Sequence, residues 1–99
     1  IPATVVARGD GIMAFRDIGP QAPVHVLVIP TAHVASLNDA TDPALLGRLM
    51  RFTADVAKQE GLAERGYRTV INTNKDGGQM VDHLHIHVLG GRRMTWPPG

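Results

Sequence analysis

Cysteine is absent from this sequence of 99 residues, and aromatic residues make up only 4% of it. Without cysteine, disulfide bonds, thiolate zinc sites and a cysteine nucleophile are all excluded. The absence is compatible with a reducing compartment, and we expect a cytoplasmic protein. No apolar run approaches the roughly 20 residues that cross a bilayer, so we expect no membrane partner.

The sequence also has no large excess of charge of either sign. Ten Lys and Arg residues stand against nine acids, which gives a formal net charge of +1, and the basic residues are scattered along the chain. Nucleic-acid-binding proteins carry a concentrated basic surface, so we expect no nucleic-acid partner. The hydrophobic content of 43% suits one compact domain over residues 1–99. Because the chain starts at Ile1 rather than at methionine, we expect that a native N-terminal segment is missing from it.

The order of the predicted elements indicates an α+β domain. Strand-like patterns cover residues 3–8, 12–16, 24–29, 67–72 and 80–89. A long helix is predicted from Pro43 to Gly61, because apolar positions recur there at helical spacing and Asp42 can cap it. We also predict a short helical turn at 33–37 and a loop at 74–78. Since three strands precede the long helix without crossover helices, the sheet is expected to be largely antiparallel.

The last predicted strand carries histidine at three alternate positions, His83, His85 and His87, with aliphatic residues between them. Side chains alternate between the two faces of a strand, so the three imidazoles are expected to share one face. Serine or threonine would satisfy an ordinary polar face equally well. Three histidines there indicate a chemical role.

Several interpretations of this row are open. An exposed polar face or the remnant of an expression tag is one, although tags are contiguous and terminal. A zinc site is another, because two histidines at alternate positions can chelate one ion. The outer two side chains start roughly 13 Å apart on a strand, however, so a zinc ion would need His25 or a ligand from another strand.

A catalytic interpretation uses the row differently. A neutral imidazole is a nucleophile and a charged one is a general acid, and adjacent rings separate these states because two positive rings repel. The loop before the row, Gly77-Gly78-Gln79, offers backbone N–H groups and an amide that can contact a phosphate. The sequence therefore predicts a phosphoryl group over the middle histidine, His85.

Two signatures in the sequence resemble those of the histidine triad (HIT) nucleotide-binding proteins, in the branch that cleaves nucleoside phosphoramidates. One comprises Gly77-Gly78-Gln79, the run from His83 to Arg92 and the ending Trp96-Pro97-Pro98-Gly99; the other runs from Phe15 to Pro30. The resemblance extends over residues 1–99. It implies a HIT-like fold with a five-stranded antiparallel sheet, one long helix and one short helix. It further implies a homodimer with a continuous ten-stranded sheet.

The resemblance implies the following catalytic roles. His85 matches the nucleophile that becomes nucleotidylated, His87 the residue beside the scissile phosphate, and His83 the residue that helps to orient the row. His25 matches a fourth histidine from a neighbouring strand. Asp17 matches the carboxylate that binds the ribose hydroxyls.

The remaining matches are to residues that contact the substrate or the active site of the partner subunit. They are Phe15, Ile18 and Leu27 in the base pocket, Asn72, Gly78 and Gln79 around the phosphate, and Trp96, which reaches the partner's site. Two positions depart from the branch. Met80 replaces a serine or threonine that hydrogen-bonds near the leaving group, and Asp82 replaces an aromatic residue. A thioether is a poor hydrogen-bonding substitute, so Met80 is expected to weaken activity or change the preferred leaving group.

The function implied is hydrolysis of the P–N bond in purine nucleoside 5'-phosphoramidates, through a nucleotidyl-histidine intermediate and without a metal or other cofactor. The purine nucleotide is the expected substrate, and a second copy of the chain is the expected partner. Two alternatives stay open. One is a regulatory nucleotide-binding protein with vestigial hydrolysis, which Met80 favours, and the other is a histidine-based zinc-binding protein.

Overall fold

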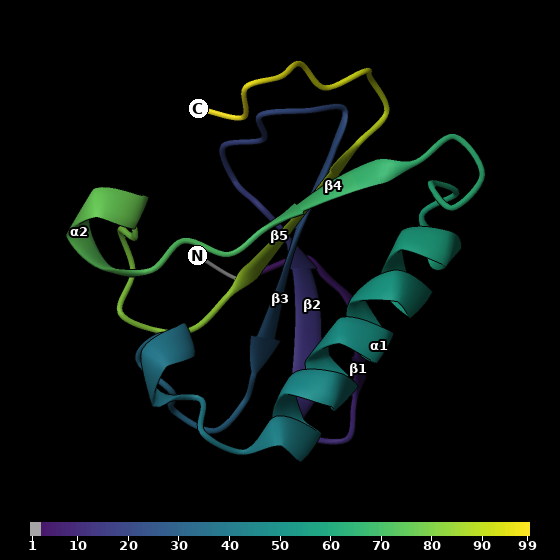
Figure 1. Ribbon diagram of the computed structural model, residues 1–99. Coiled ribbons are helices and arrows are strands. Elements are labelled where there is room, and N and C mark those ends of the chain that lie inside the picture. The colour runs from purple at the N-terminus through teal and green to yellow at the C-terminus, as the bar shows by residue number, and fades with distance from the viewer. Residues whose placement is uncertain (1–2) are drawn as a thin grey trace.

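The computed structural model describes residues 3–99 as a five-stranded antiparallel sheet with one long helix across one face (Figure 1). The strands are β1 (Val5–Gly9), β2 (Ile12–Arg16), β3 (Val24–Pro30), β4 (Tyr67–Val70) and β5 (Ile86–Gly90). Their order in the sheet is β1-β2-β3-β5-β4, so β5, the last strand in the sequence, lies between β3 and β4. The predicted α+β fold with five antiparallel strands is confirmed.

The long helix α1 (Pro43–Gln59) begins as its sequence predicts. The carboxylate of Asp42 accepts a hydrogen bond of 3.0 Å from the N–H of Ala44, which satisfies one of the free donors at the helix start. Its inner face buries Leu49 and Val56 against the sheet. Burying each such side chain stabilises the fold by roughly 1.5–3 kcal/mol. No helix within residues 3–99 has the length and apolar character needed to cross a membrane.

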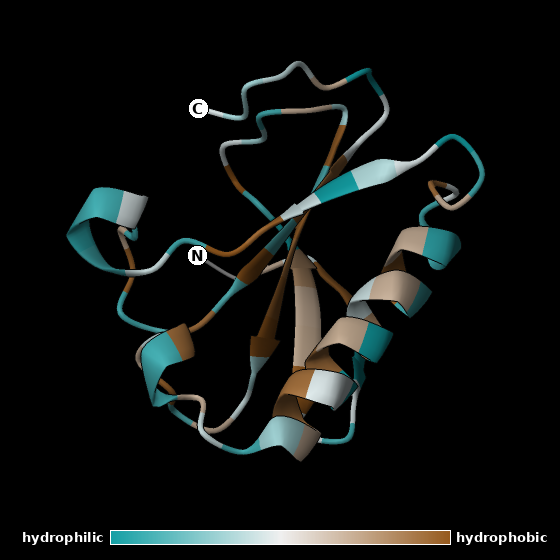
Figure 2. Cartoon of the chain, in the orientation of Figure 1, coloured by the Kyte–Doolittle hydropathy of each residue, from teal (hydrophilic) through white to brown (hydrophobic). Residues whose placement is uncertain are grey.

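The core lies between α1 and the inner face of the sheet, and the central strand β3 is largely brown in Figure 2. From the sheet it includes Ile12, Ala14, Val26, Val28, Ile86 and Val88. The opposite face of the sheet carries the candidate site. There Leu27 of β3 lies directly across from His87 of β5 on one side and from Phe15 of β2 on the other.

The last strand is shorter than the predicted range 80–89. It begins after His85, so His83 and His85 lie on the segment that precedes the strand. Continuing the register of β3 and β5 would place Pro30, which has no N–H to donate to the ladder, opposite Leu84. Instead, the N–H of Leu84 donates to the carbonyl of Val34 at 2.7 Å. The alternation itself persists, because Leu84 is buried and the two histidines are only half-buried.

Two short helical segments also differ from the prediction. The helical turn η1 comprises Leu37–Asp39 rather than residues 33–37, because the hydroxyl of Ser36 accepts a hydrogen bond from the chain two residues further on and so caps the turn. The predicted loop at 74–78 contains one helical turn, α2 (Asn74–Gly77). Gly78 ends it in the left-handed region, at φ 77°.

The strands β1 and β4 form the two edges of the sheet. β4 ends at Val70, two residues before the predicted end at Asn72, and it pairs with β5 on one side. The start of the predicted domain, residues 1 and 2, lies outside the described residues. The ten-stranded sheet of a homodimer stays a prediction.

Candidate active site

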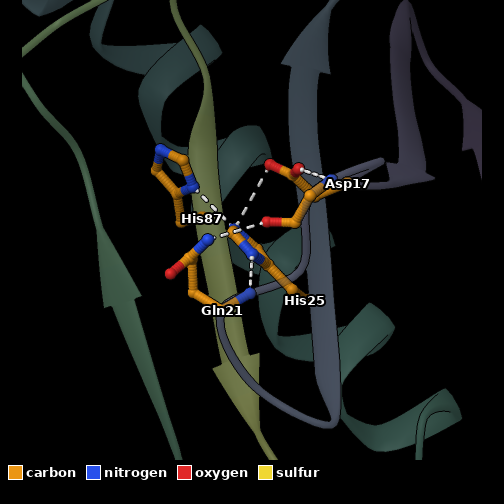
Figure 3. A network of polar contacts seen from close by, with 5 residues as sticks. Asp17, Gln21, His25 and His87 are labelled. Atoms are coloured by element: carbon orange, nitrogen blue, oxygen red, sulfur yellow. Dashed lines mark hydrogen bonds and ion pairs between the residues drawn. The ribbon is translucent and has the colours of Figure 1, made fainter.

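The centre of the site is a hydrogen-bonded pair of histidines, His25 from β3 and His87 from β5. His25 is only 6% exposed, and its Nδ1 accepts a hydrogen bond of 3.1 Å from the backbone N–H of Gln21. A neutral imidazole carries one proton, so that of His25 is on Nε2. This Nε2 lies 2.9 Å from Nδ1 of His87 (Figure 3). His87 accepts the bond and therefore carries its own proton on Nε2, on the far side of its ring.

Asp17 follows β2 directly and lies beside this pair (Figure 3). One carboxylate oxygen, Oδ2, is 3.5 Å from Nε2 of His25, and the other accepts a hydrogen bond of 2.7 Å from the N–H of Gly19. The backbone N–H of Asp17 donates to the carbonyl of His25 at 3.0 Å. The carboxylate is thus held at the end of the sheet with one oxygen facing the histidine pair.

Burial lowers the pKa of His87 below its ordinary value of 6.5, and the neighbouring rings of His85 and His25 lower it further, against a smaller upward effect of Asp17. Desolvation disfavours the charged form, and nearby imidazolium charges would repel it. His87 is therefore neutral at pH 7, which agrees with its role as acceptor from His25.

His85 has the opposite arrangement of its ring nitrogens. Its Nδ1 lies 2.7 Å from the backbone carbonyl of His83. A carbonyl can only accept, so the proton of His85 is on Nδ1 and its Nε2 has a free lone pair. The rings of His85 and His87 meet edge to face with centroids 4.9 Å apart. One imidazole with a free lone pair therefore lies next to one that bears a proton.

His83 is turned toward a fifth histidine rather than toward the pair. Its Nε2 donates to the carbonyl of Pro30 at 2.8 Å, and its Nδ1 lies 3.4 Å from Nδ1 of His33. The side chain of His33 is exposed. Its contact with His83 was missed, because nothing in the sequence pattern of a loop indicates which distant residue it meets.

Asp17, His25 and His87 also form a possible metal site, since one ligand atom from each lies within 4.8 Å of the others. A metal on Nε2 of His25 would displace the proton there to Nδ1. That proton would then face the N–H of Gln21, whose nitrogen is 3.1 Å away. The donors therefore fit a chain of hydrogen bonds better than they fit a metal ion.

The predicted wall of the base pocket lies beside the histidines. Leu27 is across from His87 and Phe15 is across from Leu27, so the three side chains share one face of the sheet. Both apolar residues are half-buried, whereas Ile18 in the loop after β2 is 83% exposed. An apolar surface with an exposed edge thus begins next to the proton-bearing histidine.

The expected phosphate cradle is not preformed at Gly78 and Gln79. The backbone N–H groups of both residues donate to carbonyls of α2 and so close its turn. The side-chain amide of Gln79 accepts from the N–H of Asn74 at 2.9 Å and donates to the carbonyls of Ala35 and Val81 at 2.8 and 3.0 Å. Gln79 therefore fixes this loop against the segment after β3.

The other predicted residues lie outside the hydrogen-bonded histidine cluster. Asn72 follows β4 and is half-buried. Met80 is 94% exposed and Trp96 is 81% exposed, and the guanidinium of Arg68 lies 6.0 Å from the indole centroid. Gln21 is a further residue of the site, because its backbone N–H donates to His25. The sequence did not indicate it, since a main-chain donor does not depend on the type of side chain.

A lone pair on one imidazole and a proton on the next, at the face of an α+β sheet, form an arrangement suited to nucleophilic and acid–base chemistry. The sequence profile of the HIT domain matches residues 1–94, and the chain belongs to this family. The crystal structure of a HIT family hydrolase from Legionella pneumophila has a TM-score of 0.95 and 54% identity, over 100% of this chain and 90% of that one.

Two curated relatives have named activities. Purine nucleoside phosphoramidase from Escherichia coli is 50% identical over 94 residues, which cover 93% of this chain and 79% of the relative. Adenylylsulfatase HINT1 from Arabidopsis thaliana is 52% identical over 103 residues, which cover 100% of this chain and 69% of the relative. The recognised family, the histidine triad and the kinship to hydrolases are thereby confirmed.

Proposed function

We propose that this protein hydrolyses the P–N bond of purine nucleoside 5'-phosphoramidates and releases a nucleoside monophosphate and an amine. The observation that carries the proposal is the free Nε2 lone pair of His85 next to the proton on Nε2 of His87. The kinship to a purine nucleoside phosphoramidase supports the choice of substrate. The kinship to an adenylylsulfatase supports the purine nucleotide and leaves a second leaving group to be tested.

In the first step, Nε2 of His85 attacks the α-phosphorus and a P–N bond to the imidazole forms. The anionic substrate stabilises a positive charge beside it, so His87 takes up a second proton from solvent when the substrate binds. The bond to the leaving amine breaks, its nitrogen receives the proton from Nε2 of this charged His87, and the ring returns to the neutral form. The carbonyl of His83, 2.7 Å from Nδ1 of His85, accepts a stronger hydrogen bond as that ring becomes positive. This contact orients the nucleophile and stabilises the charge that develops on it.

In the second step, water attacks the phosphorus and the bond to Nε2 of His85 breaks. One proton of the water passes to the free Nε2 of neutral His87, which restores the charged form, and release of the product returns the extra proton to solvent. The contact of 2.9 Å between Nδ1 of His87 and Nε2 of His25 keeps the free nitrogen of His87 directed to the substrate in this step. The cycle consumes one water and needs no other reactant.

Substrate binding is assigned to the residues around this pair. The free oxygen of Asp17 is proposed to accept hydrogen bonds from the ribose hydroxyls, and the base is proposed to lie against Phe15, Ile18 and Leu27. Polar contacts with the phosphate are proposed for Asn72, Gly78 and Gln79. Because the N–H groups of the last two are engaged in α2, these contacts require the loop to adjust when substrate binds.

We also propose that two copies form a homodimer. The support is three exposed apolar residues: Tyr67 on the edge strand β4, 37% exposed, Met50 on α1, 47% exposed, and Trp96 on the C-terminal segment, 81% exposed. Exposed apolar residues at a sheet edge are a common basis for association. Light scattering of the purified protein tests this, and a monomer at working concentration contradicts it.

Intact-protein mass spectrometry tests the proposed activity. The protein is mixed with adenosine 5'-phosphoramidate and quenched in mild base, which preserves the phosphohistidine bond. A transient adenylyl adduct is expected in the wild type and in His33→Ala, the matched control. No adduct and no turnover are expected in His85→Ala, while His85→Asn is expected to keep the fold. A fully active His85→Ala protein would show that His85 is not the nucleophile.

The second candidate function is nucleotide binding with vestigial hydrolysis. It is favoured by Met80, which is 94% exposed and offers no strong donor beside the leaving group. The same experiment separates the two functions, because a binding protein shows affinity for the nucleotide but no adduct. The substitution Met80→Ser is expected to raise the rate by up to about a hundredfold if a missing donor limits it.

A further inference from the structure

A cavity of about 680 Å³ lies away from the histidines, where the chain between α1 and β4 meets the segment after β5. Three arginines line it, Arg65, Arg92 and Arg93, and no acidic residue does. None of the three belongs to an ion pair within residues 3–99. The cavity therefore has an uncompensated positive charge.

A second cavity shows what a neutralised arginine site in this protein looks like. It has about 410 Å³, lies between the turn after β1 and α1, and is lined by Arg48 and Arg51 together with Asp10 and Asp55. Arg51 and Asp55 form an ion pair of 2.8 Å. Its charges are thus balanced by its own residues, whereas the first cavity requires a balancing charge from outside.

The cavity with three arginines is also shaped for a ligand with several oxygens. Arg92 is already oriented, because its Nη2 donates to the carbonyl of Gln21 at 3.0 Å and its Nη1 to that of Arg93 at 3.3 Å. The adjacent Gly91 has φ 90°, and a Cβ there would lie 2.7 Å from Pro23. No side chain can occupy that position, so the wall beside Arg92 consists of main chain.

We propose that this cavity binds a phosphate-bearing anion at a site separate from His85 and His87. Guanidinium groups present pairs of N–H donors whose spacing matches two oxygens of a phosphate. Like charges gathered in a concave site raise the local potential and favour an anion. Arg65 and Arg93 supply the free charges, and Arg92 supplies a group already held in place.

Arg92 also connects this site with the histidine pair. The carbonyl of Gln21 accepts from Arg92, and the N–H of Gln21 donates to Nδ1 of His25, which in turn donates to His87. An anion that binds Arg92 and weakens its hydrogen bond to the carbonyl of Gln21 makes Gln21 less ordered. Gln21 is the residue whose N–H keeps the proton of His25 on Nε2. Binding at the cavity is therefore expected to lower kcat, a consequence that rests on the proposed function.

Binding is tested by NMR titration of the ¹⁵N-labelled protein with pyrophosphate, following the backbone amides of Gly66 and Gly91. Saturable shifts are expected in the wild type. The double variant Arg65→Ser, Arg93→Ser is expected to bind at least about tenfold more weakly, because hydrogen bonds between charged groups are each worth about that factor. The control Arg48→Ser, from the neutralised cavity, is expected to change affinity less than about twofold. No saturable shift, or equal weakening in the control, overturns the site.

The coupling is tested by steady-state kinetics with added pyrophosphate. Competition at the active site alone raises KM, whereas occupation of the arginine cavity is expected to lower kcat in the wild type but not in the double variant. An unchanged kcat in the wild type overturns the coupling. The NMR titration needs no turnover, so it decides on the anion site even if the proposed phosphoramidate hydrolysis is wrong.

Discussion

The protein contains two pairs of histidines in contact. The pairs differ in the main-chain group that each one contacts and therefore in the direction of their hydrogen bonds. The inner pair, His25 and His87, is joined at 2.9 Å, and its far end is a backbone donor, the N–H of Gln21. The outer pair, His33 and His83, is joined at 3.4 Å, and its far end is a backbone acceptor, the carbonyl of Pro30.

The group at the far end sets the direction of each chain of hydrogen bonds. In the inner pair, the N–H of Gln21 donates to His25 and His25 donates to His87, so each imidazole has its proton on Nε2. The N–H of His87 is therefore on the side of its ring away from His25. An acceptor behind the outer pair draws the proton of His83 into the protein. Burial reinforces the difference, because His25 is 6% exposed while His33 is exposed to water. Two similar imidazole pairs are thus suited to proton delivery and to structural support respectively.

Among substitutions in the two pairs, the largest effect is expected from His87→Ala. Loss of a general acid lowers the rate by about 10² to 10⁴ when the leaving group must be protonated, as an amine must. A substrate with a nitrophenolate leaving group needs no proton and is expected to lose much less. Comparison of kcat for the two substrates measures this. Equal losses would show that His87 does not act as the acid.

A smaller loss is expected from His25→Leu, which removes the donor to Nδ1 of His87. His87 can then adopt the tautomer with its proton on the wrong nitrogen, and a change of this kind costs up to about 10⁴ in a well-known triad. We expect between about tenfold and a thousandfold here, since the ring of His87 remains in place. The readout is kcat with an amine leaving group, and circular dichroism verifies the fold. An unaltered kcat would mean that the inner pair does not set the tautomer.

The inner pair is also expected to make stability depend on pH. Because the pKa of His87 is lowered in the folded protein, the unfolded chain binds more protons below pH 6.5. The free energy of unfolding is therefore highest above pH 6.5 and falls as the pH drops through that value toward the lowered pKa. Urea unfolding at several pH values between about 5 and 8 measures this. His87→Gln is expected to flatten the dependence, and a slope identical to that of the wild type would assign it to other groups.

The smallest effect is expected from His33→Ala in the outer pair. Substitution of an exposed residue usually changes stability by less than about 0.5 kcal/mol. The contact of His33 is with His83 and not with His85 or His87, so kcat is expected to stay within about twofold. A loss as large as that of His25→Leu would erase the distinction between the pairs. It would place the outer pair in the reaction.

The elements with a long regular pattern were predictable from the sequence. α1 has both a helical period and a capping residue, Asp42, and β2 matches its predicted range. One predicted end was wrong because a distant part of the chain decides it. The shortening of the last strand depends on Pro30, which is far away in the sequence and adjacent only in the sheet.

The candidate site was predictable where side chains alternate and unpredictable where the main chain acts. The alternation correctly placed Leu84 in the core and the histidines on the other side. The role of Gln79 in holding its own loop depends on two main-chain carbonyl groups, that of the distant Ala35 and that of the nearby Val81. The N–H of Gln21 is equally invisible, since every residue except proline has such a group.

The hydrogen bond from His85 to residue 83 has a consequence for how this site tolerates change. The acceptor is the carbonyl of the peptide chain, so it is present whatever side chain stands at that position. The orientation of the His85 ring therefore does not depend on which side chain residue 83 carries. Another side chain can therefore replace the imidazole at position 83 without changing the orientation of the His85 ring.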